Sequence, residues 1–134
     1  MTSPHEMVNV RYMVDDVQAA VDFYTGHLGF ALRASAAPAF ADVIRGNLRL
    51  LLAGPASSAG RPMPDGRTPE PGGWNRIHFI VDDIEAEAAR LEALGARRVA
   101  AEQMHEHGTS WVLMTDPEGN EFCVCDGGQG TGTP

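Results

Sequence analysis

Two stretches of the chain share one pattern of hydrophobic and polar positions. Residues 10–16 read VRYMVDD and residues 77–83 read IHFIVDD, so each is an apolar run that ends in an acidic pair. Such a run is typical of a buried strand that leads into a helix. The acidic pairs can cap the exposed amides at the helix starts and complement the helix dipole. The pattern therefore predicts a strand followed by a helix in each half of the chain.

A helical pattern follows each acidic pair. Apolar side chains recur there at three- and four-residue spacing, at Val17, Ala20, Val21, Tyr24 and Leu28 in the first half and at Ile84, Ala88, Leu91 and Leu94 in the second. Gly29 and Gly95 come next, and glycine readily adopts the left-handed backbone that ends a helix. We expect two helices that end close to these glycines.

The ends of the two halves also correspond. Residues 46–52, GNLRLLL, resemble residues 119–125, GNEFCVC, and each Gly-Asn pair predicts a hairpin turn into a last strand. Further strands are expected at 40–44 and 110–114, and near 30–34 and 97–101. The sequence thus predicts an α+β fold of two βαβββ modules. Together they are expected to form a curved eight-stranded mixed sheet with helices outside and a concave ligand pocket.

The chain is expected to form a single domain over residues 1–126. Module one covers about 7–53, a linker covers 54–73, and module two covers about 74–126. The linker contains five prolines and five glycines, which predicts a loop. A loop of this length serves either as a functional lid or as a plain connector, and both readings stay open. Residues 127–134 are rich in Gly, Thr, Gln and Pro and predict a disordered tail.

Charge and cysteine content narrow the classes of function. The formal net charge of −8 disfavours nucleic acid and anionic membranes as partners. The two cysteines, Cys123 and Cys125, are too close along a strand for an unstrained disulfide, so reduced thiols and a cytoplasmic location are expected. No signal peptide is evident, and no apolar run approaches the roughly 20 residues of a membrane span. A small molecule is therefore the expected partner.

The repeated motifs resemble those of the vicinal oxygen chelate superfamily, which includes glyoxalases, bleomycin-resistance proteins and extradiol dioxygenases. The resemblance rests on VDDVQAAVDFYTGHLGF (14–30), IHFIVDDIEAEAARLEALGA (77–96) and TDPEGNEFCV (115–124). It implies a glyoxalase-like domain made of two paired modules. It says little about the reaction, because one fold hosts many functions.

Metal-dependent members of this superfamily hold their metal at four inward positions, on the first and the last strand of each module. The aligned motifs place Asn9, Leu50, Arg76 and Cys123 at these positions. Leucine offers no lone pair, and arginine is a permanent cation that repels a metal. The resemblance therefore implies a member that lacks the usual metal ligands, and we expect no metal and no other cofactor.

Strand alternation predicts the other side chains of the pocket. Arg11 and Met13 share the side of Asn9, and His78 shares the side of Arg76. The expected ligand contacts are Asn9, Arg11, Met13, Leu50, Arg76, His78, Trp111 and Cys123. This mixture favours an apolar or aromatic compound with an anionic or acceptor group. Alternatively, the two arginines pair with acidic neighbours such as Glu121 or Asp126.

Two classes of function follow from these residues. We favour a metal-free small-molecule-binding protein, with antibiotic resistance by sequestration as one role. The alternative is a lyase, isomerase or dioxygenase of the same superfamily, which uses His78 as the candidate catalytic residue, Cys123, or a non-standard metal site. The resemblance also implies a homodimer.

Overall fold

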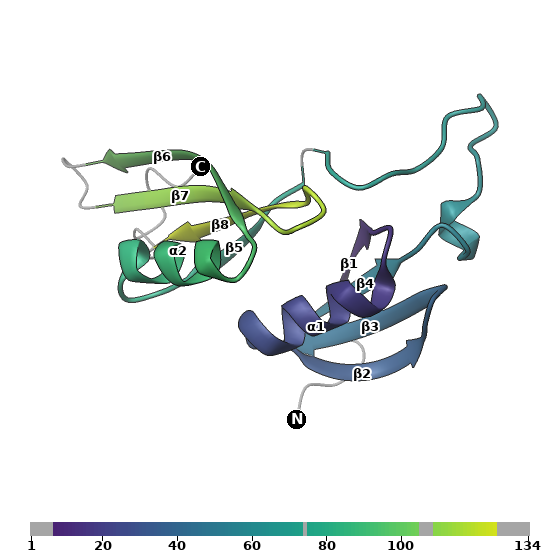
Figure 1. Ribbon diagram of the computed structural model, residues 1–134, viewed down its shortest axis with the longest axis horizontal. Helices are drawn as coiled ribbons and strands as arrows, with labels where there is room; N and C mark the ends of the chain where they lie inside the picture. Colours follow the sequence, from purple (N-terminus) through teal and green to yellow (C-terminus); the bar gives the residue numbers. More distant parts are fainter. Residues whose placement is uncertain (1–6, 74, 105–108, 126–134) are drawn as a thin grey trace. The chain divides into compact units, whose positions relative to one another are not determined.

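The chain folds into two modules of the same architecture, each with one helix on a four-stranded sheet (Figure 1). The computed structural model describes residues 7–73, 75–104 and 109–125. Its two compact units are Met1–Gly72 and Gly73–Pro134. The predicted pair of βαβββ modules is confirmed, and hydrogen bonds group the strands into two sheets of four. The tail predicted at 127–134 lies outside the described residues.

Module one begins and ends with strands that lie side by side. It comprises β1 (Val8–Met13), α1 (Val17–His27), β2 (Ala31–Ala36), β3 (Phe40–Arg45) and β4 (Leu48–Ala53). The strand order is β1-β4-β3-β2, with β1 parallel to β4 and the other neighbours antiparallel. A parallel pair needs a long connection, which α1, β2 and β3 supply here.

An aromatic cluster holds α1 against its sheet. The ring of Tyr24 is fully buried, and its centroid lies 5.5 Å from that of Phe23 and 5.6 Å from that of Phe30, both edge to face. Tyr12 of β1 approaches the same ring at 6.3 Å. Edge-to-face contacts of this kind stabilise a core beyond the area that they bury.

Module two repeats the arrangement of module one. It comprises β5 (Ile77–Ile80), α2 (Ile84–Ala93), β6 (Arg97–Met104), β7 (Thr109–Thr115) and β8 (Glu121–Cys125). The strand order is β5-β8-β7-β6, and β5 is parallel to β8. Leu91 of α2 and Phe122 of β8 are fully buried, and the ring of Phe79 meets Phe122 edge to face at 5.7 Å.

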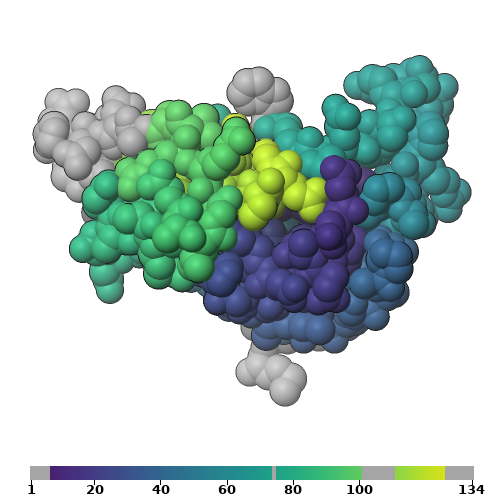
Figure 2. All heavy atoms as spheres, viewed as in Figure 1, coloured from purple at the N-terminus to yellow at the C-terminus, as the bar shows by residue number. Residues whose placement is uncertain are grey.

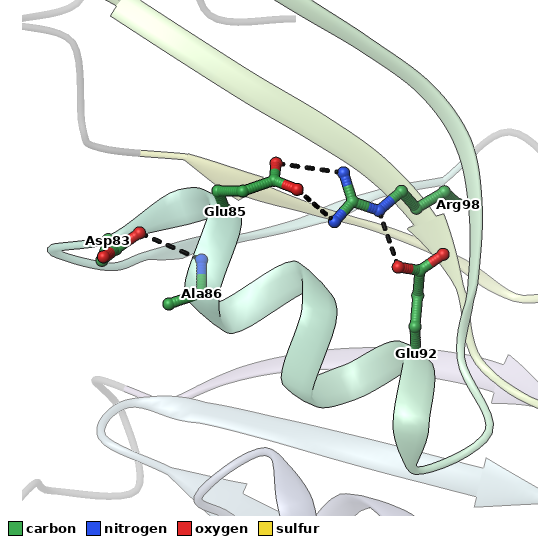
Figure 3. Close-up of polar contacts among 5 residues, drawn as sticks. All are labelled: Asp83, Glu85, Ala86, Glu92 and Arg98. Carbon is green, nitrogen blue, oxygen red and sulfur yellow. Dashed lines mark hydrogen bonds and ion pairs between the residues drawn. The ribbon is translucent and has the colours of Figure 1, made fainter.

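The acidic pairs cap both helices, as the sequence predicted. The carboxylate of Asp16 accepts a hydrogen bond from the amide of Ala19 at 3.0 Å, and Asp83 accepts one from Ala86 at 3.0 Å (Figure 3). The cap is thus the second aspartate of each pair.

In the described part of the chain, neither helix has both the length and the apolar character to cross a membrane.

Arg98 of β6 forms ion pairs with glutamates at both ends of α2 (Figure 3). It donates from Nη2 to Oε1 of Glu85 at 2.8 Å and from Nε to Oε1 of Glu92 at 2.9 Å. Hydrogen bonds to the two carboxylates raise the pKa of Arg98, and the bond from Arg98 lowers the pKa of Glu85. Because the pKa of Glu85 is lowered in the folded protein, its ion pair with Arg98 stabilises the fold above the usual pKa of glutamate. The stabilisation is lost as the pH falls through the folded-state pKa of Glu85.

Candidate functional site

One face of the module-one sheet points away from α1. The ring of Tyr12 points at α1, so its neighbours along the strand, Arg11 and Met13, point to the opposite face. Asn9 shares that face, and both Asn9 and Arg11 are exposed. The alternation expected from the sequence thus holds in β1. The face of this sheet that carries Asn9, Arg11 and Met13 is called the arginine face below.

A pocket of about 410 Å³ lies beside Arg11, entirely within module one. Its lining residues are Arg11, Ala39, Phe40, Ala53, Ala56, Ser57, Ser58 and Ala59. The volume is typical of sites for small organic molecules. Four alanines and one phenylalanine make up most of the lining, and Arg11, Ser57 and Ser58 are its polar residues. Such a pocket fits an apolar body that carries an anionic or accepting group.

The start of the linker forms one wall of this pocket. The segment carries the 3₁₀ helix η2 (Ser58–Gly60), which follows a turn in which the Ser57 hydroxyl donates to the Gly54 carbonyl at 2.7 Å. Gly60 lies so close to Pro55 that a Cβ added to it would stand 2.6 Å from the Pro55 carbonyl oxygen. Figure 2 shows the teal atoms of the linker beside the blue atoms of the same module. This part of the linker therefore packs against its own module and lines the pocket.

Leu50 lies on the other face of the sheet, which corrects its predicted facing. Leu50 pairs in register with Val10 and is fully buried. The places on the arginine face belong to Arg49 and Leu51, because Leu51 is the partner of Arg11. Leu50 therefore belongs to the core under α1, and the predicted set had the wrong phase at this strand.

The phase error comes from two unequal turns. In module one the Gly-Asn pair is the whole turn, since Arg45 pairs with Leu48. In module two the pair is only the end of a longer turn, since Thr115 pairs with Glu121. The two Gly-Asn pairs are therefore not equivalent, and superposing them shifts the last strand by one residue. A shift of one residue turns every side chain of a strand to the other face.

A buried carboxylate joins two arginines on the arginine face. Asp42 of β3 is fully buried, and Arg33 donates to it from Nε to Oδ1 at 2.7 Å and from Nη2 to Oδ2 at 2.8 Å. These bonds raise the pKa of Arg33. Arg49 donates from Nη2 to Oδ2 at 3.3 Å, and its buried Nε has no acceptor within the described residues. The sequence interpretation missed this cluster, although an aspartate inside the apolar strand 40–44 was a signal for it.

Arg76 in module two has an acidic partner. Its Nε donates to Oε1 of Glu121 at 3.0 Å, and about a third of the arginine side chain, 30%, is exposed. This is one of the two pairings that the sequence offered as the alternative to a ligand-binding role. The other named partner, Asp126, lies outside the described residues.

His78, Cys123 and Trp111 share one face of the module-two sheet. His78 pairs in register with Cys123, and Trp111 pairs with Cys125, the next residue of β8 on that face. Phe79 is buried on the opposite face, so the alternation expected for this strand also holds. His78 itself is exposed, whereas Cys123 is fully buried.

Burial makes Cys123 a poor nucleophile. Desolvation, and after it the neighbouring Cys125, raise the pKa of the Cys123 thiol from 9.0 to about 12, against a smaller opposing effect of Arg76. The thiolate fraction at pH 8 is therefore about a thousandfold below that of an ordinary cysteine.

We expect an aromatic disulfide reagent to leave both cysteines of the native protein unmodified at pH 8 and to react with both in denaturant. Rapid modification of Cys123 in the native protein, located by peptide mass, would contradict this.

The positions at which the superfamily holds a metal do not carry a metal-binding set in this chain. Arg76 is a cation in an ion pair, and neither Leu50 nor Leu51 has a lone pair to offer. Asn9 supplies an amide, and the raised pKa of Cys123 disfavours the thiolate that a metal would need. Over residues 7–73, 75–104 and 109–125, no group of three or more His, Cys, Asp or Glu comes together. The donor chemistry does not fit the superfamily's metal.

Comparison with known proteins accounts for the two-module fold. The family model described as a glyoxalase-like domain matches residues 7–125. The chain belongs to this family. Among solved structures, a lactoylglutathione lyase from Agrobacterium tumefaciens is 24% identical with a TM-score of 0.68, and the match covers 97% of this chain and 99% of that one.

Two further structures show the range of names attached to this glyoxalase-like fold. A member of the glyoxalase/bleomycin resistance protein/dioxygenase superfamily from Sphaerobacter thermophilus is 26% identical, with a TM-score of 0.68 and coverage of 89% of this chain and 94% of that one. The fosfomycin resistance protein FosX from Mesorhizobium loti is 13% identical, with a TM-score of 0.63 and coverage of 90% and 91%. No curated protein matches the chain.

Proposed function

We propose that this glyoxalase-like protein is a metal-free small-molecule-binding protein that holds an apolar or aromatic compound through an anionic or acceptor group. The observation that carries the proposal is the pocket in which Arg11 is the charged lining residue. A guanidinium forms charge-assisted hydrogen bonds with a carboxylate or phenolate, and these are stronger than hydrogen bonds between neutral groups. Asn9 and Met13 flank Arg11 on the same face and are proposed as further contacts.

Resistance by sequestration is the proposed biological role. A binder that retains a toxic compound needs a pocket and an anchoring charge, and it needs no reacting group. One structural relative is named as a fosfomycin resistance protein, which lends this role some support. The protein is proposed to act in the cytoplasm, where its two cysteines stay reduced.

Catalysis by the same fold is the alternative, and His78 is the residue that favours it. His78 is exposed on its sheet face, and an imidazole is the side chain most often used as a general acid or base. We propose His78 and Trp111 as ligand contacts on the module-two face rather than as reacting groups. Cys123 does not support covalent catalysis, because it is buried and its pKa is raised to about 12.

The test of the proposed function is an isosteric pair of probes, 2-naphthoate and neutral 2-naphthamide. We expect Arg11→Gln to raise the Kd of naphthoate about 10- to 150-fold, the equivalent of about 1.5–3 kcal/mol for a charge-assisted hydrogen bond. The Kd of naphthamide should stay within a factor of about two, since no charge is lost in its contact. Titration followed by naphthalene fluorescence gives both constants.

Arg67→Gln is the matched control for this test. Arg67 lies in the exposed linker, paired with Asp65 at 2.8 Å, so its removal changes the net charge without touching the pocket. Equal binding of the two probes to the wild-type protein, or equal effects of the two substitutions, would contradict the proposal. Naphthoate binding that disappears after chelator dialysis and returns with a divalent metal would favour the metal-dependent alternative.

A homodimer is proposed for the functional protein, as the superfamily resemblance implies. We expect sedimentation equilibrium at micromolar concentration to give twice the chain mass of 14.3 kDa. A monomer that binds naphthoate with full affinity would show that assembly is not required for the site.

A further inference from the structure

A series of hydrogen bonds ties the segment after β4, residues 54–60, to module one. The amide of Gly54 donates to the Ala39 carbonyl at 2.9 Å, between β2 and β3. The Gly54 carbonyl accepts from the amide of Ser57 at 3.1 Å and from its hydroxyl at 2.7 Å. The amide of Gly60 then donates to the Ser57 carbonyl at 3.0 Å. Residues 56–59 of this segment line the pocket, so these bonds fix the position of a pocket wall.

Gly60 is where the 54–60 segment closes on itself. It is buried, and a Cβ added to it would stand 2.6 Å from the carbonyl oxygen of Pro55 and 2.8 Å from that of Gly54. The φ of Gly60 lies outside the left-handed region that favours glycine. Space, rather than backbone conformation, therefore requires glycine at this position.

An alanine at position 60 would have to move the pocket wall. The segment would have to open by roughly 0.8 Å to bring the 2.6 Å approach to the 3.4 Å of an ordinary contact. One of the two carbonyls pushed aside is that of Gly54, which anchors Ser57. A gap of about 0.5–1 Å forfeits about a quarter to a half of the dispersion attraction between two surfaces. A ligand that touches residues 56–59 would therefore lose much of its contact with them.

We infer that Gly60 is a positioning residue that determines selectivity for the apolar body of the ligand, because its missing side chain lets residues 56–59 stand against that body. This inference rests on the proposed function and divides recognition into two parts. Arg11 recognises the charge of the ligand, and the wall that Gly60 positions recognises the size of its apolar body. Gly60 is not itself a lining residue, so it acts through its neighbours.

The test uses three probes, 2-naphthoate, neutral 2-naphthamide and benzoate, which carries the carboxylate on one ring instead of two. We expect the wild-type protein to bind naphthoate about tenfold more tightly than benzoate, because the second ring buries more apolar area. In Gly60→Ala this advantage should fall at least about threefold, since the wall has moved. The ratio between naphthoate and naphthamide should stay within a factor of about two, because the contact with Arg11 is unchanged.

Gly95→Ala is the matched control for this test. Gly95 follows α2 in module two and has a φ of 110°, so alanine there strains the backbone without touching the pocket. A general loss of stability weakens the binding of every probe alike and leaves both ratios unchanged. Gly95→Ala should therefore keep the wild-type ratios, whereas Gly60→Ala should change only the ratio of naphthoate to benzoate.

Ser57→Ala tests the same wall without adding volume. It removes the 2.7 Å bond to the Gly54 carbonyl and should lower the advantage of naphthoate over benzoate about twofold. An unchanged advantage in folded Gly60→Ala, or in Ser57→Ala where Gly60→Ala does not fold, would overturn the inference and leave the Arg11 site standing. Equal binding of naphthoate and benzoate by the wild-type protein would do the same. If neither acid binds, the proposed function fails and the inference fails with it.

Discussion

Replacing Tyr24 with alanine is expected to lower the free energy of unfolding of module one by about 3–5 kcal/mol, the usual cost of removing a large aromatic ring from a core. Tyr24 is fully buried and contacts the rings of Phe23 and Phe30 edge to face, at 5.5 and 5.6 Å. The loss includes both the apolar area and the ring geometry, and it leaves a cavity between α1 and the sheet. Whole domains are stable by only about 5–15 kcal/mol, so this change removes a large part of the stability.

Urea denaturation followed by circular dichroism measures this loss, and Tyr24→Phe is the matched control. Phenylalanine keeps the ring and should cost much less than alanine. A Tyr24→Ala protein within about 1 kcal/mol of the wild type would show that the aromatic cluster does not hold α1 in place.

Replacing Asp42 with alanine is expected to have the second largest effect, a loss of about 2–4 kcal/mol in the free energy of unfolding. Breaking a buried ion pair typically costs about 3–5 kcal/mol, and the value is discounted here because the arginine partners reach solvent. Asp42 is 0% exposed, whereas the side chain of Arg33 is 46% exposed and that of Arg49 is 31% exposed. Without the carboxylate, Arg33 and Arg49 lose the acceptor that they share and repel each other.

Thermal and urea unfolding of Asp42→Ala and Asp42→Asn at low and high salt test this prediction. Salt screens repulsion between exposed charges, so the loss should shrink as the ionic strength rises. The Asn variant keeps the volume and one acceptor and should fall between alanine and the wild type. A loss below about 1 kcal/mol in Asp42→Ala at low salt would show that the cluster is dispensable for the fold.

The elements of the fold follow from local patterns. Asp16 and Asp83 mark the helix starts because capping depends only on residues three positions away. The strands β1 and β5 could be placed, with the correct facing, from their distance to these caps. Alternation along a strand is local information, so the order of residues alone assigns Arg11 and His78 to a face.

The site depends on contacts between residues far apart in the sequence, and the sequence interpretation was weaker there. Leu50 was given the wrong face because a turn of different length separates the last strands of the two modules. The wall at Ser57 and Ser58 depends on how Gly60 packs on Pro55, which no periodicity encodes. Asp42 attracts Arg33 and Arg49 only once three strands are aligned, so spacing along the chain does not reveal the cluster.

The pocket wall contributed by η2 has an evolutionary consequence. The lining residues come from the strands of module one, from the turn between β2 and β3, and from the first residues after β4, so none of them belongs to module two. Loops accept insertions and deletions far more readily than strands do. One inserted residue between Pro55 and Gly60 would reshape the wall while every strand kept its hydrogen bonds. The segment that follows the last strand of module one is thus a place where ligand preference can change at little risk to the fold.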